Sequence, residues 1–230
     1  MKRFDAVLFD KDGTLFDFHR TWGAWTHGFI HDLAGDAGAV GPVAAAMGYD
    51  LDKSAFRPDS VVIAGSVDVW ADHILPHLAG WTKPRLVSHI KDRTATATQV
   101  PSTDLDPFLK GLTALGYRLG VATNDGHAPV TRQLRDAGIA HHFDFVAGYD
   151  SGYGAKPDPG MLLAFARQMN TSPDRTVMVG DSTHDLVAAR RAGMTRVGVL
   201  TGIAARADLD PFADVVLSDI SDLPDWLESH

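Results

Sequence analysis

The chain of 230 residues contains no cysteine. Disulfides, thiolate metal ligands and a cysteine nucleophile are therefore excluded. Basic residues are also in the minority, because 21 Lys and Arg face 29 Asp and Glu and give a formal net charge of −8. Binding to a nucleic-acid backbone needs a basic surface, so this balance argues against a nucleic-acid partner. The 11 His are scattered without the spacing of a zinc site.

Long apolar stretches are missing as well. No run approaches the about 20 residues that span a bilayer. The start, Met1-Lys2-Arg3, leads into an apolar stretch too short for a signal peptide. We therefore expect a cytoplasmic protein with no membrane partner. The hydrophobic content of 45% and the length fit a globular protein with one domain and a large insertion, or two small domains.

The most informative stretch is 7–17, Val-Leu-Phe-Asp-Lys-Asp-Gly-Thr-Leu-Phe-Asp. An apolar run of strand type ends at Asp10 and Asp12, and Gly13 then turns the chain. Two carboxylates about 4 Å apart repel by about 1 kcal/mol in water and about 4 kcal/mol near a protein surface. The pair therefore indicates a bound cation, a shared proton or a reaction, although an Asx turn alone would explain Asp12-Gly13.

The region after this stretch has a helical pattern up to about residue 96. Trp22, Trp25, Phe29 and Leu33 recur at spacings of three and four, as on one face of a helix. Three more helices are predicted, over 42–47, 60–78 and 83–96. The segments predicted to be loops or irregular are 35–41 and 48–57. We thus expect an all-helical domain, 18–96, inserted into a core of 1–17 and 97–230.

From about residue 100 onward, strand and helix patterns alternate. Strands that follow the first one are predicted over 117–122, 143–147, 176–179, 196–200 and 214–217. Most of them are separated by helices, a pattern typical of parallel strands. The predicted fold class is α/β, with a doubly wound, mostly parallel sheet, in which ligands bind at the carboxyl ends of the strands.

Polar residues follow two of these later strands. Thr123-Asn124 comes directly after one strand, where a hydroxyl and an amide could bind oxygens or simply cap the next helix. Lys156 lies in a glycine-rich loop before Pro157-Asp158-Pro159, where a lone lysine is usually only solvated.

Two carboxylates follow the strand over 176–179. Asp181 is placed to offer an oxygen ligand to a hard divalent cation. Asp185 has a competing explanation, because Ser182 at the N-cap and Asp185 three residues later would form a capping box.

These motifs resemble the four motifs of the haloacid dehalogenase-like (HAD) superfamily, in the same order. The matching segments are Asp-x-Asp-Gly-Thr-Leu at 10–15, Thr123-Asn124, Lys156 in Gly-x-Lys-Pro-x-Pro, and Gly-Asp-Ser-x-x-Asp at 180–185. Most members of the superfamily are magnesium-dependent phosphatases. The helical insertion resembles a C1-type cap, and the whole chain is similar to the phosphoglycolate-phosphatase-like subgroup.

The resemblance implies a role for each aspartate. Asp10 would be the nucleophile that forms an aspartyl-phosphate, and Asp12 the general acid and base. Mg²⁺ would be held by Asp10, the backbone carbonyl of Asp12, and Asp181. Asp185 would be associated with the metal directly or through water.

The resemblance also implies how the substrate is held. Thr123, the Asn124 amide and Lys156 would bind the phosphoryl group, and Thr123 and Lys156 would assist catalysis. The expected partner is a small phosphorylated metabolite, such as 2-phosphoglycolate or a sugar phosphate. Asp125 and Gly126 receive no predicted role, and the oligomeric state is not predicted.

Two alternatives stay open. A phosphomutase of the same superfamily has all four motifs. A non-enzymatic phospho-acceptor or binding module also combines clustered Asp, Thr and Lys on a parallel sheet, although such domains are shorter and lack the helical insertion. The presence of Asp12 argues against a dehalogenase, which needs no proton for its leaving halide.

Overall fold

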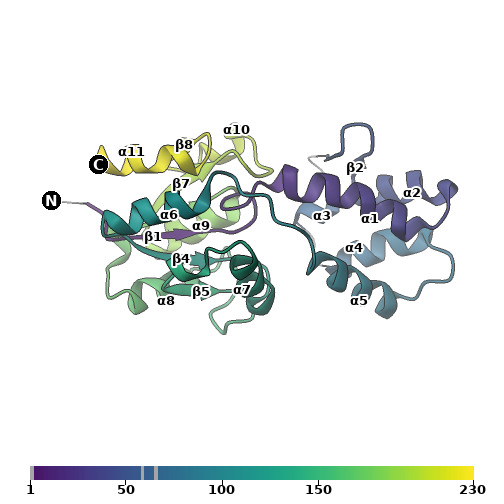
Figure 1. The fold of residues 1–230 in the computed structure, drawn as a ribbon, viewed down its shortest axis with the longest axis horizontal. Helices are drawn as coiled ribbons and strands as arrows, with labels where there is room; N and C mark the ends of the chain where they lie inside the picture. Colours follow the sequence, from purple (N-terminus) through teal and green to yellow (C-terminus); the bar gives the residue numbers. More distant parts are fainter. Residues whose placement is uncertain (1–2, 58–59, 65–66) are drawn as a thin grey trace. The chain divides into compact units, whose positions relative to one another are not determined.

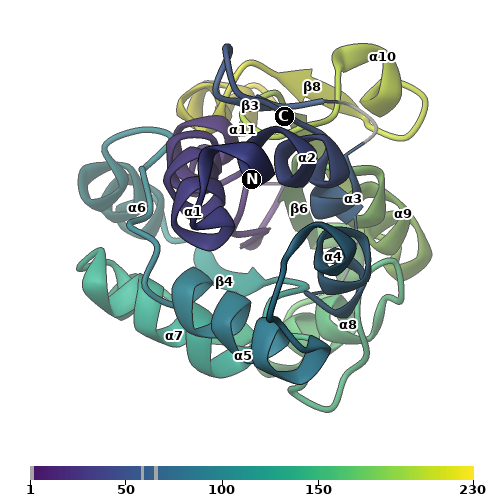
Figure 2. The ribbon, with the colours of Figure 1, turned by 90° about the vertical axis from the view of Figure 1, so that its right-hand side faces the viewer.

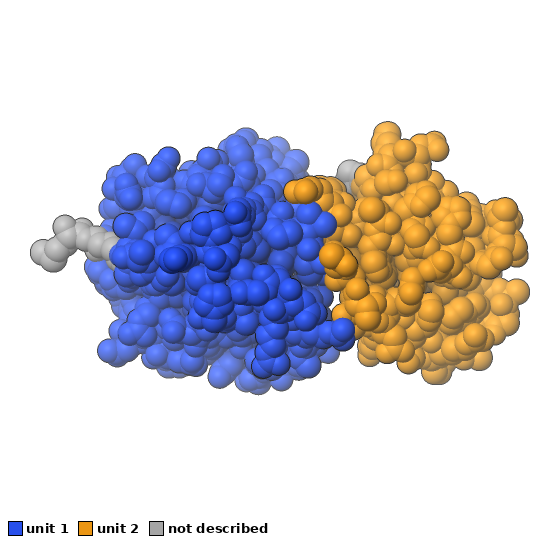
Figure 3. Space-filling view, viewed as in Figure 1, with its two compact units in different colours: residues 1–18, 99–230 blue, residues 19–98 orange. Residues whose placement is uncertain are grey.

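The computed structural model describes residues 3–57, 60–64 and 67–230. Its contacts divide the chain into two compact units, shown in blue and orange in Figure 3. The sheet unit comprises Met1–Phe18 and Gln99–His230, and the helical unit comprises His19–Thr98. No helix in the described part of the chain is long and apolar enough to cross a membrane.

The sheet unit is built on one sheet with the strand order β5-β4-β1-β6-β7-β8. Its strands are β1 (Ala6–Phe9), β4 (Arg118–Ala122), β5 (Phe145–Ala147), β6 (Thr176–Gly180), β7 (Thr195–Val199) and β8 (Val215–Leu217). All five neighbouring pairs run parallel. Strands β1, β4, β5, β7 and β8 are labelled in Figure 1. The predicted doubly wound, mostly parallel sheet is confirmed.

Helices cover both faces of this sheet. On one side lie α6 (Leu105–Ala114) and α7 (His127–Asp136), and on the other α8 (Gly160–Gln168) and α9 (Thr183–Ala192) (Figure 2). Shorter elements of the same unit are η3 (Ala140–His142), η4 (Pro173–Arg175), α10 (Arg206–Leu209), η5 (Ile220–Asp222) and α11 (Leu223–Glu228). Because successive side chains of a strand point to opposite faces, β1 contributes to two cores. Val7 and Phe9 pack with α6, α7 and α11, whereas Ala6 and Leu8 pack with α8 and α9.

The strand order reverses beside β1. The chain runs from β1 through β4 to β5, and then returns to the other side of β1 to form β6. Ligand sites of open α/β sheets lie at the carboxyl ends of the strands where the order reverses. The fold therefore predicts a ligand site at the loops that follow β1, β4, β5 and β6.

The helical unit holds mainly helices. They are η1 (His19–Gly23, a π-helix), α1 (Ala24–Ala34), α2 (Ala37–Met47), α3 (Val61–Ala64), α4 (Val67–Ile74), η2 (Leu75–His77) and α5 (Lys83–Thr94). Within α1, Trp25 stacks on Phe29 with ring centroids 4.8 Å apart, and Trp22 of η1 meets Trp25 edge to face at 5.4 Å. These aromatic rings pack against one another inside the unit.

Three expectations for this region are wrong. The unit is not all-helical, because β2 (Tyr49–Asp50) and β3 (Ala55–Phe56) form an antiparallel hairpin. The segment 35–41 is largely helical, since the Asp36 side chain caps α2 by accepting hydrogen bonds from the amides of Gly38 and Ala39. The α-helix expected over 60–78 ends at Ile74 and gives way to the 3-10 helix η2, because Pro76 has no N–H to donate to an α-helical hydrogen bond. Gly65, a glycine in the middle of the helix expected over 60–78 that weakens this prediction, lies outside the described residues.

Candidate active site

Asp10 follows β1 directly and is almost completely buried. Its amide donates to the carbonyl of Val179 at 2.9 Å, which continues the pairing of β1 with β6 by one residue. The residue is 8% exposed, and its Oδ1 accepts a hydrogen bond from Lys156 Nζ at 2.7 Å. Burial raises the pKa of Asp10 from its usual 3.8 to about 7, although Lys156 works in the opposite direction.

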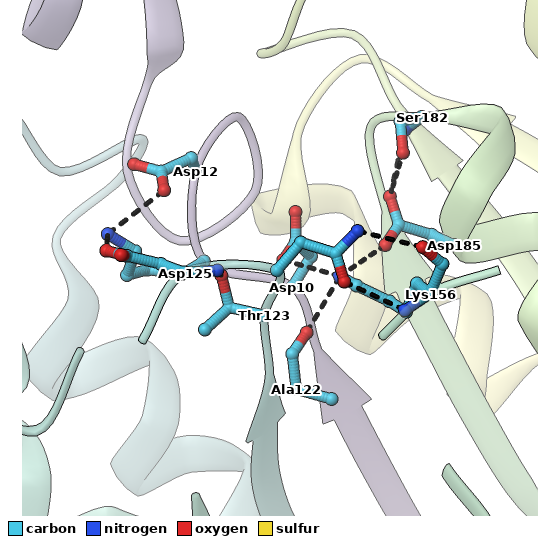
Figure 4. Close-up of polar contacts among 10 residues, drawn as sticks. Asp10, Asp12, Ala122, Thr123, Asp125, Lys156, Ser182 and Asp185 are labelled. Carbon is cyan, nitrogen blue, oxygen red and sulfur yellow. Dashed lines mark hydrogen bonds and ion pairs between the residues drawn. The ribbon is translucent and has the colours of Figure 1, made fainter. Parts of the chain in front are cut away.

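Lys156 lies at the centre of the site (Figure 4). Besides Asp10, its Nζ contacts Asp185 Oδ1 at 2.6 Å and donates to the carbonyl of Ala122 at 2.8 Å. Burial works to lower the pKa of Lys156, but Asp10 and Asp185 raise it overall, so the ammonium stays charged. A fixed positive charge therefore lies at the ends of β1 and β4.

Asn124 holds the backbone of Lys156 in place. Its side-chain carbonyl accepts from the Lys156 amide at 2.8 Å, and its side-chain amide donates to the Lys156 carbonyl at 2.9 Å. The structure thus gives the Asn124 side chain a direct part in locating Lys156.

Three buried carboxylates come together at the carboxyl ends of β1 and β6. Oxygens of Asp10, Asp181 and Asp185 lie within 4.8 Å of one another. Burial is the main cause that raises the pKa of Asp181 well above its usual value, and the charges of Asp10 and Asp185 add to it. Carboxylate oxygens are the ligands that hard divalent cations prefer, and a cation here would offset this repulsion. The donor set therefore fits a magnesium ion.

Asp185 has two roles in the structure. Its Oδ2 accepts hydrogen bonds from the Ser182 amide at 3.1 Å and from the Ser182 hydroxyl at 2.6 Å, as in a capping box at the start of α9. Its Oδ1 faces Lys156. Capping the helix therefore does not remove Asp185 from the site.

Two glycines pack closely against Asp181. A Cβ at Gly13 would lie 2.4 Å from Asp181 Oδ2, and one at Gly202 would lie 1.7 Å from the same atom. Gly13 also has a φ of +76°, a conformation that glycine adopts without strain. The turn after β1 and the loop after β7 thus need glycine to leave room for this carboxylate.

Asp12 lies apart from the carboxylate group in Figure 4. Its side chain is 26% exposed and contacts Lys11 Nζ at 3.0 Å. Thr123 is 3% exposed and accepts a hydrogen bond from the Asp125 amide at 3.1 Å. The structure therefore brings Asp10, Asp181, Asp185 and Lys156 into contact, with Asp12 and Thr123 nearby on the loops that follow β1 and β4.

Sequence reasoning missed a second polar cluster at these loops. Lys11 Nζ also contacts Asp125 Oδ2 at 3.1 Å and Gln133 Oε1 at 2.5 Å. Asp125, which received no role above, is therefore one of the ion-pair partners of the buried Lys11 ammonium. Strand alternation was the available signal, because it places Lys11 on the same face as Val7 and Phe9.

Comparison with known proteins gives the family. The model of the haloacid dehalogenase-like hydrolases matches residues 4–193. The chain belongs to this family. The probable phosphatase IndB of Dickeya dadantii is 30% identical over 93% of this HAD chain and 88% of its own length. A phosphoglycolate phosphatase of Neisseria meningitidis is also 30% identical, over 99% of this chain and 90% of its own.

A solved structure agrees in fold. The crystal structure of a HAD phosphatase from Thermococcus onnurineus has a TM-score of 0.64 with this chain, at 23% identity, and covers 97% of this chain and 98% of its own. The predicted superfamily and the predicted enzyme class, a phosphatase, are confirmed.

Proposed function

We propose that this HAD protein is a magnesium-dependent phosphatase that hydrolyses a small phosphomonoester through an aspartyl-phosphate at Asp10. The observation that carries the proposal is the carboxylate of Asp10, 2.7 Å from Lys156 Nζ and grouped with Asp181 and Asp185. A nucleophile, a fixed cation and a set of oxygen ligands are then available at one point.

Asp10 is assigned as the nucleophile because its carboxylate is held in one orientation by Lys156. A carboxylate oxygen attacks phosphorus, the phosphorus–oxygen bond to the substrate alcohol breaks, and the phosphoryl group is transferred to Asp10. Lys156 offsets the negative charge that spreads over the phosphoryl oxygens during transfer. We assign Thr123 and the Asn124 amide to the remaining phosphoryl oxygens, because both lie at the end of β4.

Asp10, Asp181, Asp185 and the backbone carbonyl of Asp12 are the groups that would hold the metal. When bound, magnesium neutralises negative charge on the carboxylates and on the phosphate, which allows an anionic nucleophile to approach an anionic substrate. The raised pKa values of Asp10 and Asp181 support this assignment, since both carboxylates gain from a nearby cation.

Asp12 is assigned as the general acid and base. Its side chain is 26% exposed and lies apart from Asp10 and Asp185 in Figure 4, so it can exchange protons with the leaving group and with water. In the first step Asp12 gives its proton to the leaving alkoxide. In the second it takes a proton from the water that attacks the aspartyl-phosphate, and both Asp10 and inorganic phosphate are released.

The substrate we infer is a small phosphomonoester of the 2-phosphoglycolate or sugar-phosphate type. The name of the N. meningitidis relative supports this choice. We also propose that the helical unit acts as a cap that excludes water and selects the substrate, and that the protein works in the cytoplasm.

The test is release of inorganic phosphate from 4-nitrophenyl phosphate and a panel of small phosphomonoesters, with magnesium and with a chelator. Wild type should need magnesium, and Asp10→Asn should lose at least about 10³-fold in kcat/KM, because no covalent intermediate can form. Asp174→Asn is the matched control, an exposed aspartate in η4 at the opposite end of β6.

Three results would contradict the proposal. Full activity of Asp10→Asn would refute the nucleophile. Transfer of phosphate to a second sugar phosphate, in place of water, would indicate a mutase. An aspartyl-phosphate that persists for minutes without turnover would indicate a phospho-acceptor.

A further inference from the structure

Lys11 is the buried lysine that the chemistry above does not use. Its side chain is 0% exposed, although an ammonium loses much hydration free energy on burial unless it is paired. Nζ contacts Asp12 Oδ2 at 3.0 Å, Asp125 Oδ2 at 3.1 Å and Gln133 Oε1 at 2.5 Å. An ammonium has three N–H donors, so three acceptors satisfy it completely.

The three acceptors come from three different elements. Asp12 lies in the turn after β1, Asp125 lies in the loop after β4, and Gln133 is a buried residue of α7. The backbone of Lys11 takes part as well, because its carbonyl accepts from the Phe16 amide at 3.1 Å within the turn after β1. Lys11 therefore fixes this turn against α7 and the end of β4.

The position of Lys11 limits what it can do. Nζ is fully covered, so it cannot touch a phosphate, and any influence on the reaction must pass through a neighbour. Burial alone works to lower the pKa of Lys11, but Asp12 and Asp125 raise it overall, which keeps the ammonium charged. Of its partners, Asp12 is the one assigned to proton transfer.

We propose that Lys11, itself held by Asp125 and Gln133, is a positioning residue that fixes the Asp12 side chain, so that its carboxylic acid gives a proton to the leaving oxygen and its carboxylate then takes one from the attacking water. This inference rests on the proposed function. An aspartate in a turn can adopt several rotamers, and a charged partner anchored by two further acceptors favours one of them. A displacement of about 1 Å in a catalytic group can cost about 10²-fold in rate.

Dependence on the leaving group separates this role from a merely structural one. An alkyl phosphate needs a proton on its leaving oxygen, whereas 4-nitrophenyl phosphate needs much less help, because nitrophenolate is a stable anion. Loss of Asp12 positioning should therefore slow alkyl phosphates far more than the aryl phosphate. General loosening of the fold would slow both alike.

The experiment measures kcat and KM of full-length Lys11→Met, Asp12→Asn and the double variant on both substrates, with magnesium. We expect Lys11→Met to lower kcat about 30-fold on the alkyl phosphate and about 3-fold on the aryl phosphate, with KM changed less than about 2-fold. In the Asp12→Asn background, Lys11→Met should add little, because the two act as one unit. Arg175→Met is the control. It breaks the ion pair between Arg175 and Asp5, which precedes β1 at the end of the strand far from the site. This variant should keep the wild-type ratio of kcat on the alkyl phosphate to kcat on the aryl phosphate.

Each result decides a separate question. If Asp12→Asn shows no leaving-group dependence, the acid assignment and this inference fail together. Suppose instead that Asp12→Asn slows the alkyl phosphate more than the aryl phosphate. If Lys11→Met then slows both substrates equally, or adds its full effect in the double variant, only this inference fails.

A second pair of variants covers the case in which Lys11→Met does not fold, as judged by circular dichroism. Asp125→Asn and Gln133→Met keep the lysine but weaken its anchors. Each should lower kcat on the alkyl phosphate about 3- to 10-fold more than on the aryl phosphate. Equal effects of both variants on the two substrates would overturn the inference.

Discussion

Burial opposes the charge that Asp10 needs as a nucleophile. The carboxyl group has a pKa of about 7 in the folded chain and a usual value of 3.8. Between these two values the folded protein binds more protons than the unfolded one, so the free energy of unfolding falls as pH rises from about 4 to about 7. Ionisation of the buried Asp10 thus lowers the free energy of unfolding near neutral pH.

Asp10→Asn should therefore stabilise the protein when magnesium is removed. At pH 8 with a chelator, we expect the free energy of unfolding in urea to rise by about 1–2 kcal/mol, because one of three clustered charges is gone. The decrease in stability between pH 5 and pH 8 should also become smaller. Asp174→Asn should leave both quantities at wild-type values, and a destabilised Asp10→Asn would refute this description of the site.

Lys156 balances the same group of charges. In Lys156→Met, Asp10 and Asp185 lose their shared cation, and we expect a loss of about 3 kcal/mol in the free energy of unfolding together with about 10³-fold in kcat/KM. Lys110→Met, at an exposed lysine of α6, is the control.

The cause of that instability can be checked with the double variant. Asp10→Asn should stabilise the protein more in the Lys156→Met background than in wild type, without recovering activity, since the carboxylate that it neutralises has lost its cation. Full additivity of the two stability changes would mean that the charges do not interact.

At the scale of single elements, the sequence predicts the ends of a helix well where residues close in sequence determine them. The structure has α9 at Thr183–Ala192, which begins with the capping box that the sequence predicts at Ser182 and Asp185 and ends at Gly193 in a left-handed conformation. In contrast, the glycines of 35–41 indicated a loop, yet the cap at Asp36 starts α2 there. The hairpin of β2 and β3 was missed because two-residue strands are too short to show alternation.

In the candidate active site, too, the residues in short local motifs were predicted, whereas contacts between distant residues were not. Resemblance to known motifs named Asp10, Lys156, Asp181 and Asp185. Asp10 and Asp181 directly follow β1 and β6, whereas Lys156 lies in the loop after β5 and Asp185 in the first turn of α9. The contacts of Lys11 could not be predicted, because they join residues 114 and 122 positions apart. Only the packing of α7 against the sheet brings these side chains together.

Gly202, in the loop after β7, should control the metal site through Asp181. A Cβ in Gly202→Ala would lie 1.7 Å from Asp181 Oδ2, so the carboxylate must move. We expect the magnesium concentration for half-maximal activity to rise about tenfold, as for changes beside metal ligands. Gly111→Ala is the matched control, because its Cβ meets nothing within 4 Å and should stabilise α6 by about 0.5–1 kcal/mol. An unchanged magnesium requirement in Gly202→Ala would refute the assignment of Asp181.

At the scale of the whole molecule, the hydrophobic core of the sheet unit is formed by residues of that unit. The buried residues of both of its hydrophobic clusters fall within 4–16 and 105–227, and none of the described residues of the helical unit is among them. The two connecting segments also pair with each other inside the sheet unit. The Asp17 amide donates to the Val100 carbonyl at 2.9 Å, and the Ser102 amide donates to the Leu15 carbonyl at 3.0 Å. The ends of the insertion are therefore held together without its help.

Replacing residues 19–98 with a short Gly-Ser linker should accordingly leave a folded sheet unit. We expect one cooperative thermal transition and a shift of that transition on adding magnesium, because the carboxylates of Asp10, Asp181 and Asp185 all remain. If the helical unit is a cap, kcat/KM for small alkyl phosphates should fall about 10²-fold or more, with a smaller loss for 4-nitrophenyl phosphate. A deletion variant that folds and keeps the wild-type preference among substrates would show that specificity resides in the sheet unit itself.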